Sequence, residues 1–172
     1  GTDGQVLTST GAGSPPAFEA AAGGGISDYH SWHLNANFQG SIDPILNWTS
    51  ALNYGGAMTV SSGIFTFPST GFWKIFCQMQ LLHTSYDSNS NAIQIETTTN
   101  DSTYALATNA ATQLIIDGSN FAGNVTTSTL FDVTSTANCK CQFVVVCEVS
   151  PTIQGITIGN FTWCEFQKLA DT

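Results

Sequence analysis

The sequence predicts an all-β protein built as an antiparallel sandwich or barrel. Apolar residues make up 42% of the 172-residue chain and charged residues only 9%, so uncharged polar residues must cover most of the solvent faces. Such faces suit strands better than helices, whose outer faces are usually rich in Glu and Lys. Apolar residues are nowhere sustained at the helical spacing over three turns, whereas short apolar runs between Gly, Pro and Asn recur.

Residues 1–25 differ in composition from the rest and are expected to form a leader. Asp3-Gly4 is a turn signal, and Gln5–Ser9 has the alternation of a short strand. A Gly/Ser/Pro turn, Ala17–Ala20 and an Ala/Gly-rich run follow. Because this segment holds too few apolar groups for a core, we expect it to be disordered or to gain its burial from other copies of the chain. The head domain is then residues 26–172.

From Ile26 onward, strand-length runs follow one another. Each ends at Gly, Pro, Asn or a polar stretch, where a ladder of backbone hydrogen bonds is interrupted. The length of the chain corresponds to about one domain with a core of its own. The expected strands are Ser31–Phe38, Ile45–Thr49, Ala57–Ser61, Gly63–Phe67, Phe72–Leu82, Ala92–Thr97, Tyr104–Ala107, Gln113–Ile116, Val125–Val133, Cys141–Val149 and Phe161–Leu169.

The strand expected after Gly71 has two apolar faces. Successive side chains of a strand point to opposite sides, which places Phe72, Lys74, Phe76, Gln78 and Gln80 on one face. A strand of a two-sheet sandwich needs only one buried face. The face that carries Phe76 therefore requires a cavity, a covering loop or another subunit. The opposite face would fill the core with Trp73, Ile75, Cys77 and Met79.

The charge of the chain disfavours two classes of partner. Three lysines, no arginine and twelve acids give a net charge of -9, which leaves few groups to neutralise phosphates. No run approaches the length of about 18 apolar residues that a membrane-spanning helix needs. We therefore expect neither nucleic acid binding nor membrane insertion.

The five cysteines are expected to be buried free thiols. Cys77, Cys141, Cys147 and Cys164 lie in strand-like apolar runs, where cysteine behaves as a small hydrophobe. An odd number of cysteines in a chain of this length fits a protein assembled in the cytoplasm better than a disulfide scaffold. The alternative is a zinc site at Cys139-Lys-Cys141 with Cys147, although no matching histidine accompanies it.

Three stretches resemble strands of the jelly-roll superfamily that contains the complement globular heads and tumour necrosis factor (TNF). The first is Gly63–Ile75, GIFTFPSTGFWKI, and the second is Asn160–Leu169 at the C-terminus. Ser128–Val133 followed by Cys141–Val146 looks like the two strands before the last. The resemblance extends from Ser27 to Leu169 and implies a two-sheet antiparallel jelly roll.

That superfamily is trimeric, so the resemblance implies a homotrimer. Carried over residue by residue, it places Lys74, Phe76, Gln78 and Trp163 at the interface between subunits. Cover from elsewhere in the same chain is the alternative explanation for the second apolar face.

The leader carries a resemblance of its own. Gly1–Phe18, GTDGQVLTSTGAGSPPAF, is similar to a segment found just before the terminal domain in tail fibres and related appendage proteins of bacteriophages, including marine ones. Together the two resemblances imply a tail or head fibre of a virion, assembled in the host cytoplasm. Its trimeric head would bind a host cell-surface glycan or protein, and its leader would contact other virion proteins.

Two segments are candidates for ligand binding. Tyr29–His33 concentrates aromatic and imidazole groups, which would stack a sugar, bind a metal or simply pack as a structural strand. The polar loops around residues 85–91 and 97–103 carry Tyr86, Asp87 and Asp101, and ligands often bind such loops on a rigid β scaffold. Plain solvated turns are the alternative there.

Nothing in the sequence indicates catalysis. Five acids fall in or beside expected strands, and a glycosidase needs two carboxyls roughly 5–9.5 Å apart. No hydrolase elbow, metalloprotease helix or phosphate loop accompanies them. We therefore expect no enzyme, no catalytic residue, no metal and no cofactor. The remaining alternatives are a capsid or baseplate decoration protein, a secreted complement-like recognition domain with paired cysteines, and a polysaccharide-degrading spike.

Overall fold

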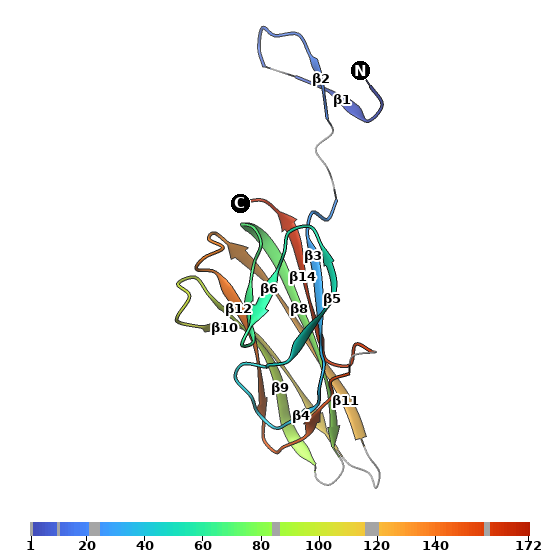
Figure 1. Cartoon of the computed structure of the whole chain (residues 1–172), viewed down its shortest axis with the longest axis vertical. Coiled ribbons are helices and arrows are strands. Elements are labelled where there is room, and N and C mark those ends of the chain that lie inside the picture. Colours follow the sequence, from blue (N-terminus) through green and yellow to red (C-terminus); the bar gives the residue numbers. More distant parts are fainter. Residues whose placement is uncertain (1, 10, 21–24, 84–86, 116–120, 157–158) are drawn as a thin grey trace.

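The computed structural model describes residues 2–9, 11–20, 25–83, 87–115, 121–156 and 159–172 (Figure 1). These residues form fourteen β-strands and no helix. Within this part of the chain, no helix is long and apolar enough to span a membrane. The predicted all-β class is confirmed.

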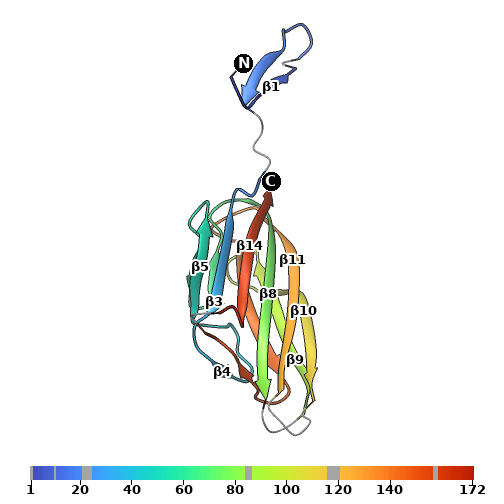
Figure 2. The ribbon, with the colours of Figure 1, turned by 90° about the vertical axis from the view of Figure 1, so that its right-hand side faces the viewer.

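The leader contains a β-hairpin. Strand β1 (Gln5–Thr8) pairs with β2 (Ala17–Ala20) in antiparallel register. Val6, Leu7 and Phe18 are 44%, 62% and 55% exposed. Figures 1 and 2 show this hairpin beyond one end of the sandwich. The strand predicted at Gln5–Ser9 is thus confirmed, and its pairing with Ala17–Ala20 is a finding of the structure.

The remaining strands form two antiparallel sheets that pack face to face. The seven-stranded sheet has the order β4-β13-β8-β14-β3-β5, and β11 pairs with the other side of β8. Its strands are β3 (Tyr29–Leu34), β4 (Phe38–Gln39), β5 (Trp48–Tyr54), β8 (Gly71–His83), β11 (Phe121–Val133), β13 (Thr152–Ile153) and β14 (Trp163–Ala170). The five-stranded sheet has the order β10-β9-β12-β7-β6 and contains β6 (Thr59–Ser61), β7 (Ile64–Thr66), β9 (Ser88–Thr98), β10 (Ala105–Leu114) and β12 (Lys140–Cys147).

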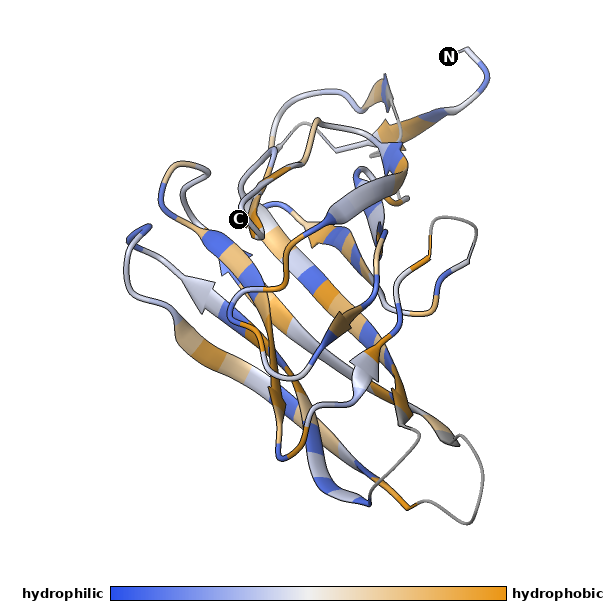
Figure 3. Ribbon diagram, turned by 60° about the horizontal axis from the view of Figure 1, so that its bottom comes forward, coloured by the Kyte–Doolittle hydropathy of each residue, from blue (hydrophilic) through white to orange (hydrophobic). Residues whose placement is uncertain are grey.

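Side-chain alternation determines which face of each strand is buried. In β8, Trp73, Ile75, Cys77, Met79 and Leu81 are completely buried, and the residues between them are half-buried. Figure 3 shows this alternation as bands of apolar and polar colour along the strands. A period of two is what a pleated strand imposes when only one face meets the core.

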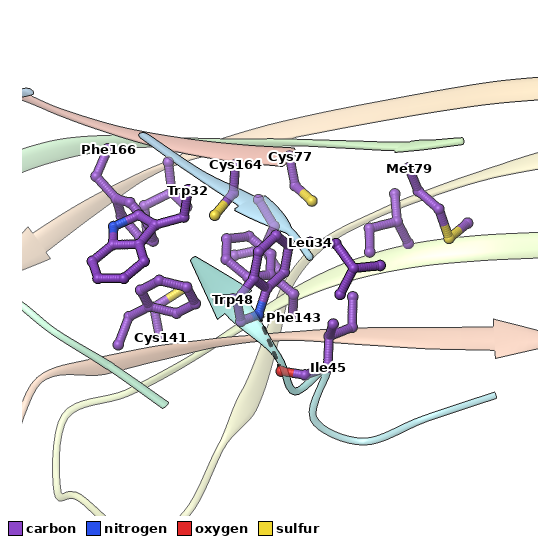
Figure 4. Close-up of a cluster of buried hydrophobic side chains, with 14 of the residues drawn as sticks. Trp32, Leu34, Ile45, Trp48, Cys77, Met79, Cys141, Phe143, Cys164 and Phe166 are labelled. Carbon is purple, nitrogen blue, oxygen red and sulfur yellow. Dashed lines mark hydrogen bonds between the residues drawn. The ribbon is translucent and has the colours of Figure 1, made fainter. Parts of the chain in front are cut away.

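The core between the sheets is strongly aromatic. Phe65 lies at its centre, with ring centroids 4.9 Å from Phe166, 5.5 Å from Phe143 and 5.8 Å from Trp48. The Trp48 ring also donates a hydrogen bond to the Ile45 carbonyl at 3.0 Å (Figure 4). Since these rings come from both sheets, they join the two layers at the separations that favour edge-to-face packing.

Two expectations about strands need correction, and one strand was not expected. We expected two separate strands at Tyr104–Ala107 and Gln113–Ile116. The structure has one strand, β10, which continues through the polar residues between them because those residues pair with β9. Ile116 lies outside the described residues. The strand expected at Ser31–Phe38 is divided into β3 and β4. The two-residue strand β13 has no sequence signal, because so short a segment shows no period.

Candidate functional site

The face of the seven-stranded sheet that points away from the five-stranded sheet is the main candidate site, and we call it the open face. Figure 2 shows β5, β3, β14, β8 and β11 side by side, with no other strand in front of them. Lys74, Phe76 and Gln78 of β8 lie on the open face and are half-buried. The predicted division of this strand into an inward and an outward face is confirmed, and the interface role of the outward face stays a prediction.

Phe76 and Trp163 form an aromatic pair on the open face. Their ring centroids are 5.1 Å apart, with the planes inclined at 50°. The register places Trp163 of β14 opposite Gln78 of β8, two pairs along from Glu165 and Phe76. The Gln78 amide donates to the Phe161 carbonyl at 3.2 Å, which ties the start of β14 to β8. Strand pairing thus brings three of the four predicted interface residues into one cluster.

A small polar network lies beside this pair. The Tyr29 hydroxyl donates to Oε2 of Glu165 at 2.7 Å, and Nζ of Lys74 lies 3.9 Å from Oε1 of the same carboxylate. Burial, followed by the hydrogen bond to Glu165 and its negative charge, raises the pKa of Tyr29 to about 12. The side chains of Glu165 and Lys74 are 18% and 44% exposed. Sequence reasoning assigned Lys74 to the interface but not its partner Glu165.

Apolar side chains surround the network and remain exposed. Leu52 and Tyr54 of β5 are 53% and 59% exposed, and Leu130 of β11, opposite Lys74, is 58% exposed. Large exposed apolar groups gathered on one face are typical of a surface that contacts another molecule. The open face therefore has an apolar rim around a small charged centre.

The His30 and Trp32 rings of β3 pack in the core. His30 is fully buried, stacks on Trp73 at 6.1 Å and contacts Oδ1 of Asn53 through Nδ1 at 2.9 Å. Trp32 packs edge-on against Phe65 in the core. Because both rings point inward, neither presents a face on which a sugar would stack. His33 is also buried, next to Trp163 in the register.

The candidate loop residues do not form one site. Tyr86 lies outside the described residues, Asp87 precedes β9, and Asp101 follows its other end. At roughly 3.3 Å per residue, the eleven-residue strand keeps Asp87 and Asp101 roughly 30 Å apart. Asp87 and Asp101 therefore lie in two separate loops, and ligand binding at either loop stays a prediction.

The loop that contains Asp101 is organised by Asn100. Oδ1 of Asn100 accepts hydrogen bonds from the backbone NH groups of Ser102 and Thr103, at 3.0 and 2.8 Å. Asp101 adopts a positive φ of 57°, which Asp tolerates better than most residues. These contacts are those of a tight Asx turn, which agrees with the alternative of a structural loop.

The structure brings together two acids that the sequence did not link. Nε2 of the buried Gln142 donates to Oδ1 of Asp43 at 2.9 Å and to Oε2 of Glu96 at 2.8 Å. These acids line a shallow groove of about 430 Å³ on the outer side of the five-stranded sheet. Because the amide lies between the two carboxylates, it occupies the gap that a sugar substrate would need. The network holds the segment around Asp43 against the sheet.

The cysteines are free thiols. Cys77, Cys139, Cys141 and Cys164 are fully buried, and Cys147 is half-buried. Among the residues that the structure describes, no group of three or more His, Cys, Asp or Glu side chains is placed to hold a metal ion. The structure thus gives the zinc alternative no support at Cys139 and Cys141.

Comparison with known proteins identifies the fold. No protein-family model matches the chain, and no curated protein matches it. Among solved structures, Eiger TNF from S. frugiperda aligns over 84% of this chain and 93% of its own, with a TM-score of 0.65 and 13% identity. Murine APRIL at pH 5.0 aligns over 83% of this chain and 98% of its own, with a TM-score of 0.58 and 10% identity. The fold is a TNF-like jelly roll.

The TNF-like jelly roll confirms the predicted two-sheet antiparallel fold, and the predicted homotrimer stays a prediction. A second structure of murine APRIL, at pH 8.5, aligns with a TM-score of 0.54 and 12% identity over 82% of this chain and 99% of its own. Identities this low establish the architecture alone. The position of β8, β14, β3 and β11 in one sheet of that architecture is what creates the open face.

Proposed function

We propose that the chain is a non-enzymatic virion attachment protein: the homotrimeric head of a phage tail or head fibre, which binds a glycan or protein receptor on the host cell surface. The observation that carries the proposal is the open face, where Phe76 and Trp163 form a half-buried aromatic pair, Leu130 is 58% exposed and no other strand of the described chain lies in front. The resemblance of residues 1–18 to the segment before fibre terminal domains supports the virion context.

Packing of the open faces of three copies explains the second apolar face of β8. Large apolar side chains gain up to roughly 1.5–3 kcal/mol each when fully buried, and a stable interface buries about 1,000 Å² or more. Trp163, Leu130, Leu52 and Tyr54 have exposed area to contribute. Intrachain cover is the weaker explanation, because Leu130, Leu52 and Tyr54 stay exposed and Trp163 is only half-buried after the chain has folded.

The leader hairpin supports attachment to other virion proteins. A two-stranded hairpin is marginally stable alone in water. The exposed Val6, Leu7 and Phe18 supply an apolar surface that a neighbouring chain or a virion protein would cover. The same feature supports the second candidate, a capsid or baseplate decoration protein, in which the leader docks and the head needs no receptor.

Receptor binding would draw its strength from multivalency. Three linked heads convert the second and third contacts with a cell surface into intramolecular events, so weak individual sites suffice. The secreted complement-like alternative predicts paired cysteines, and the five free thiols oppose it.

Native mass by light scattering coupled to gel filtration tests the assembly. We expect a mass of three chains for the full protein and for residues 26–172. Phe76→Glu should reduce the mass to one chain, because it places a carboxylate in the apolar cluster. Val146→Glu is the matched control, since Val146 is 46% exposed on β12 of the other sheet and should leave the trimer intact. A monomeric wild-type protein would contradict the proposal.

Virion incorporation and cell binding test the rest of the proposal. Deletion of residues 1–25 should abolish incorporation into virions while the head remains folded. The purified head should bind host cells and compete with virions for adsorption. Incorporation that requires residues 1–25, without cell binding by the head, would favour the decoration protein.

A further inference from the structure

We propose that Lys74 of one copy binds Glu165 of the neighbouring copy where the open faces meet. This inference rests on the proposed homotrimer and names the charged contact that its interface contains. Each copy would give one ammonium group and receive one through its carboxylate. Such a head-to-tail contact closes into a ring under three-fold symmetry.

Within one chain, the contact between these groups is incomplete. The 3.9 Å between Lys74 Nζ and Glu165 Oε1 exceeds the 2.7–3.2 Å range of a hydrogen bond. Tyr29 already holds the other carboxylate oxygen at 2.7 Å, so Glu165 is fixed in place. The structure therefore presents a positioned acceptor oxygen beside an ammonium group that is not hydrogen-bonded to it.

Of the three lysines of the chain, Lys74 is the one whose ammonium group can contact another molecule. Lys140 is 9% exposed and donates to the Thr136 carbonyl at 3.0 Å. The Lys168 side chain is 9% exposed and contacts Asp171 at 2.6 Å and Ser69 at 3.1 Å. Lys74, at 44% exposure, is the lysine free to reach another molecule.

Charge on the open face favours a second copy of the chain as the occupant. Each chain carries a net charge of -9, so copies repel one another over most of their surfaces. On the open face, Lys74 and Glu165 offset each other, and Phe76, Gln78 and Trp163 beside them are uncharged. Asp132 of β11, opposite Phe72, adds a further negative charge to this face, so Lys74 supplies the positive charge that a second copy can bind. Burial of Lys74 without a hydrogen-bonded partner would be costly, and the neighbour's Glu165 provides one.

Zero-length cross-linking distinguishes a contact between chains from one within a chain. A water-soluble carbodiimide activates the Glu165 carboxyl; the Lys74 amine then forms an amide bond with it, and the reagent leaves as a urea. A bond between chains yields covalent dimers and trimers on a denaturing gel, whereas a bond within a chain leaves a monomer band. We expect the Lys74–Glu165 peptide in the dimer and trimer bands.

The control variants separate the failure of this inference from the failure of the proposed trimer. Lys74→Arg keeps the charge but removes the reactive amine, so its native mass should stay that of three chains while the covalent oligomers disappear. The control variant Lys168→Arg should still give the covalent dimers and trimers. A wild-type trimer whose Lys74–Glu165 bond occurs in monomer bands alone would overturn the inference and leave the trimer standing. A monomeric wild-type protein would overturn both.

Discussion

Cys77 and Cys164 lie opposite each other on β8 and β14, and both side chains are fully buried as free thiols. Burial raises the pKa of both thiols, and their mutual proximity adds to the rise at Cys164. We predict that iodoacetamide adds a single group to the native protein near neutral pH, at Cys147, and five after denaturation. Intact mass spectrometry counts the adducts, and Cys147→Ser should take none while folded.

The rate of Cys147 alkylation should depend steeply on pH. Partial burial raises the pKa of this thiol to about 11, and the thiolate is the reactive form. The rate should therefore rise roughly tenfold per pH unit until the pH approaches that pKa. A plateau near pH 9 would show that Cys147 is more solvated than its half-buried position indicates.

Tyr29 should ionise later than an ordinary tyrosine. The folded protein holds its proton up to a pKa of about 12, against 10.0 in the unfolded chain. The stabilisation from this group is therefore present below about pH 10 and lost as the pH rises toward 12. Ultraviolet titration of tyrosinate should show a late component that is missing in Tyr29→Phe and shifted downward in Glu165→Gln. An unchanged component in Glu165→Gln would contradict the hydrogen bond.

Asn100→Ala should destabilise the head without changing its assembly. Removal of Oδ1 leaves the NH groups of Ser102 and Thr103 without their acceptor, at a cost of roughly 1–2 kcal/mol. Urea denaturation measures the loss. Asn109→Ala on the exposed side of β10 is the control and should stay within about 0.5 kcal/mol of the wild-type protein.

Gln142→Leu should cost roughly 1–3 kcal/mol, because it removes the donor shared by Asp43 and Glu96 from a buried position. Gln142→Glu should cost more, since it places a third carboxylate between the first two. Gln94→Leu, on the neighbouring strand at the same groove, is the matched control. If Gln142→Leu and Gln94→Leu had equal melting temperatures, the network would have no structural role.

Much of the fold could be predicted from local patterns in the sequence. The period of two between Phe72 and Leu82 predicted the buried side of β8 correctly, because a pleated strand against one core allows no other arrangement. The short motifs at Gly63–Ile75 and Asn160–Leu169 predicted the jelly roll. The sequence did not predict β10 as one strand, since its residues 108–112 show no apolar period and form a strand by pairing with β9.

The side-chain networks of the candidate sites could not be predicted, because they depend on contacts between residues far apart in the sequence. No spacing rule connects Tyr29 with Glu165, or Asp43 with Glu96 through Gln142, because the partners are brought together by the order of strands in the sheets. The separation of Asp87 from Asp101 is the opposite case, in which nearby positions are held apart by a rigid strand.

The sequence alone determined that this chain is all-β, which face of β8 meets the core and that most of the thiols are buried, because these properties follow from composition and local period. The tertiary structure determined which side chains contact one another. Examples are the Phe76–Trp163 pair, the contacts of the Glu165 carboxylate with Tyr29 and Lys74, and the inward orientation of the His30 and Trp32 rings. The physical reason is that side-chain alternation is a local property of a strand, whereas register and strand order depend on the packing of the whole chain.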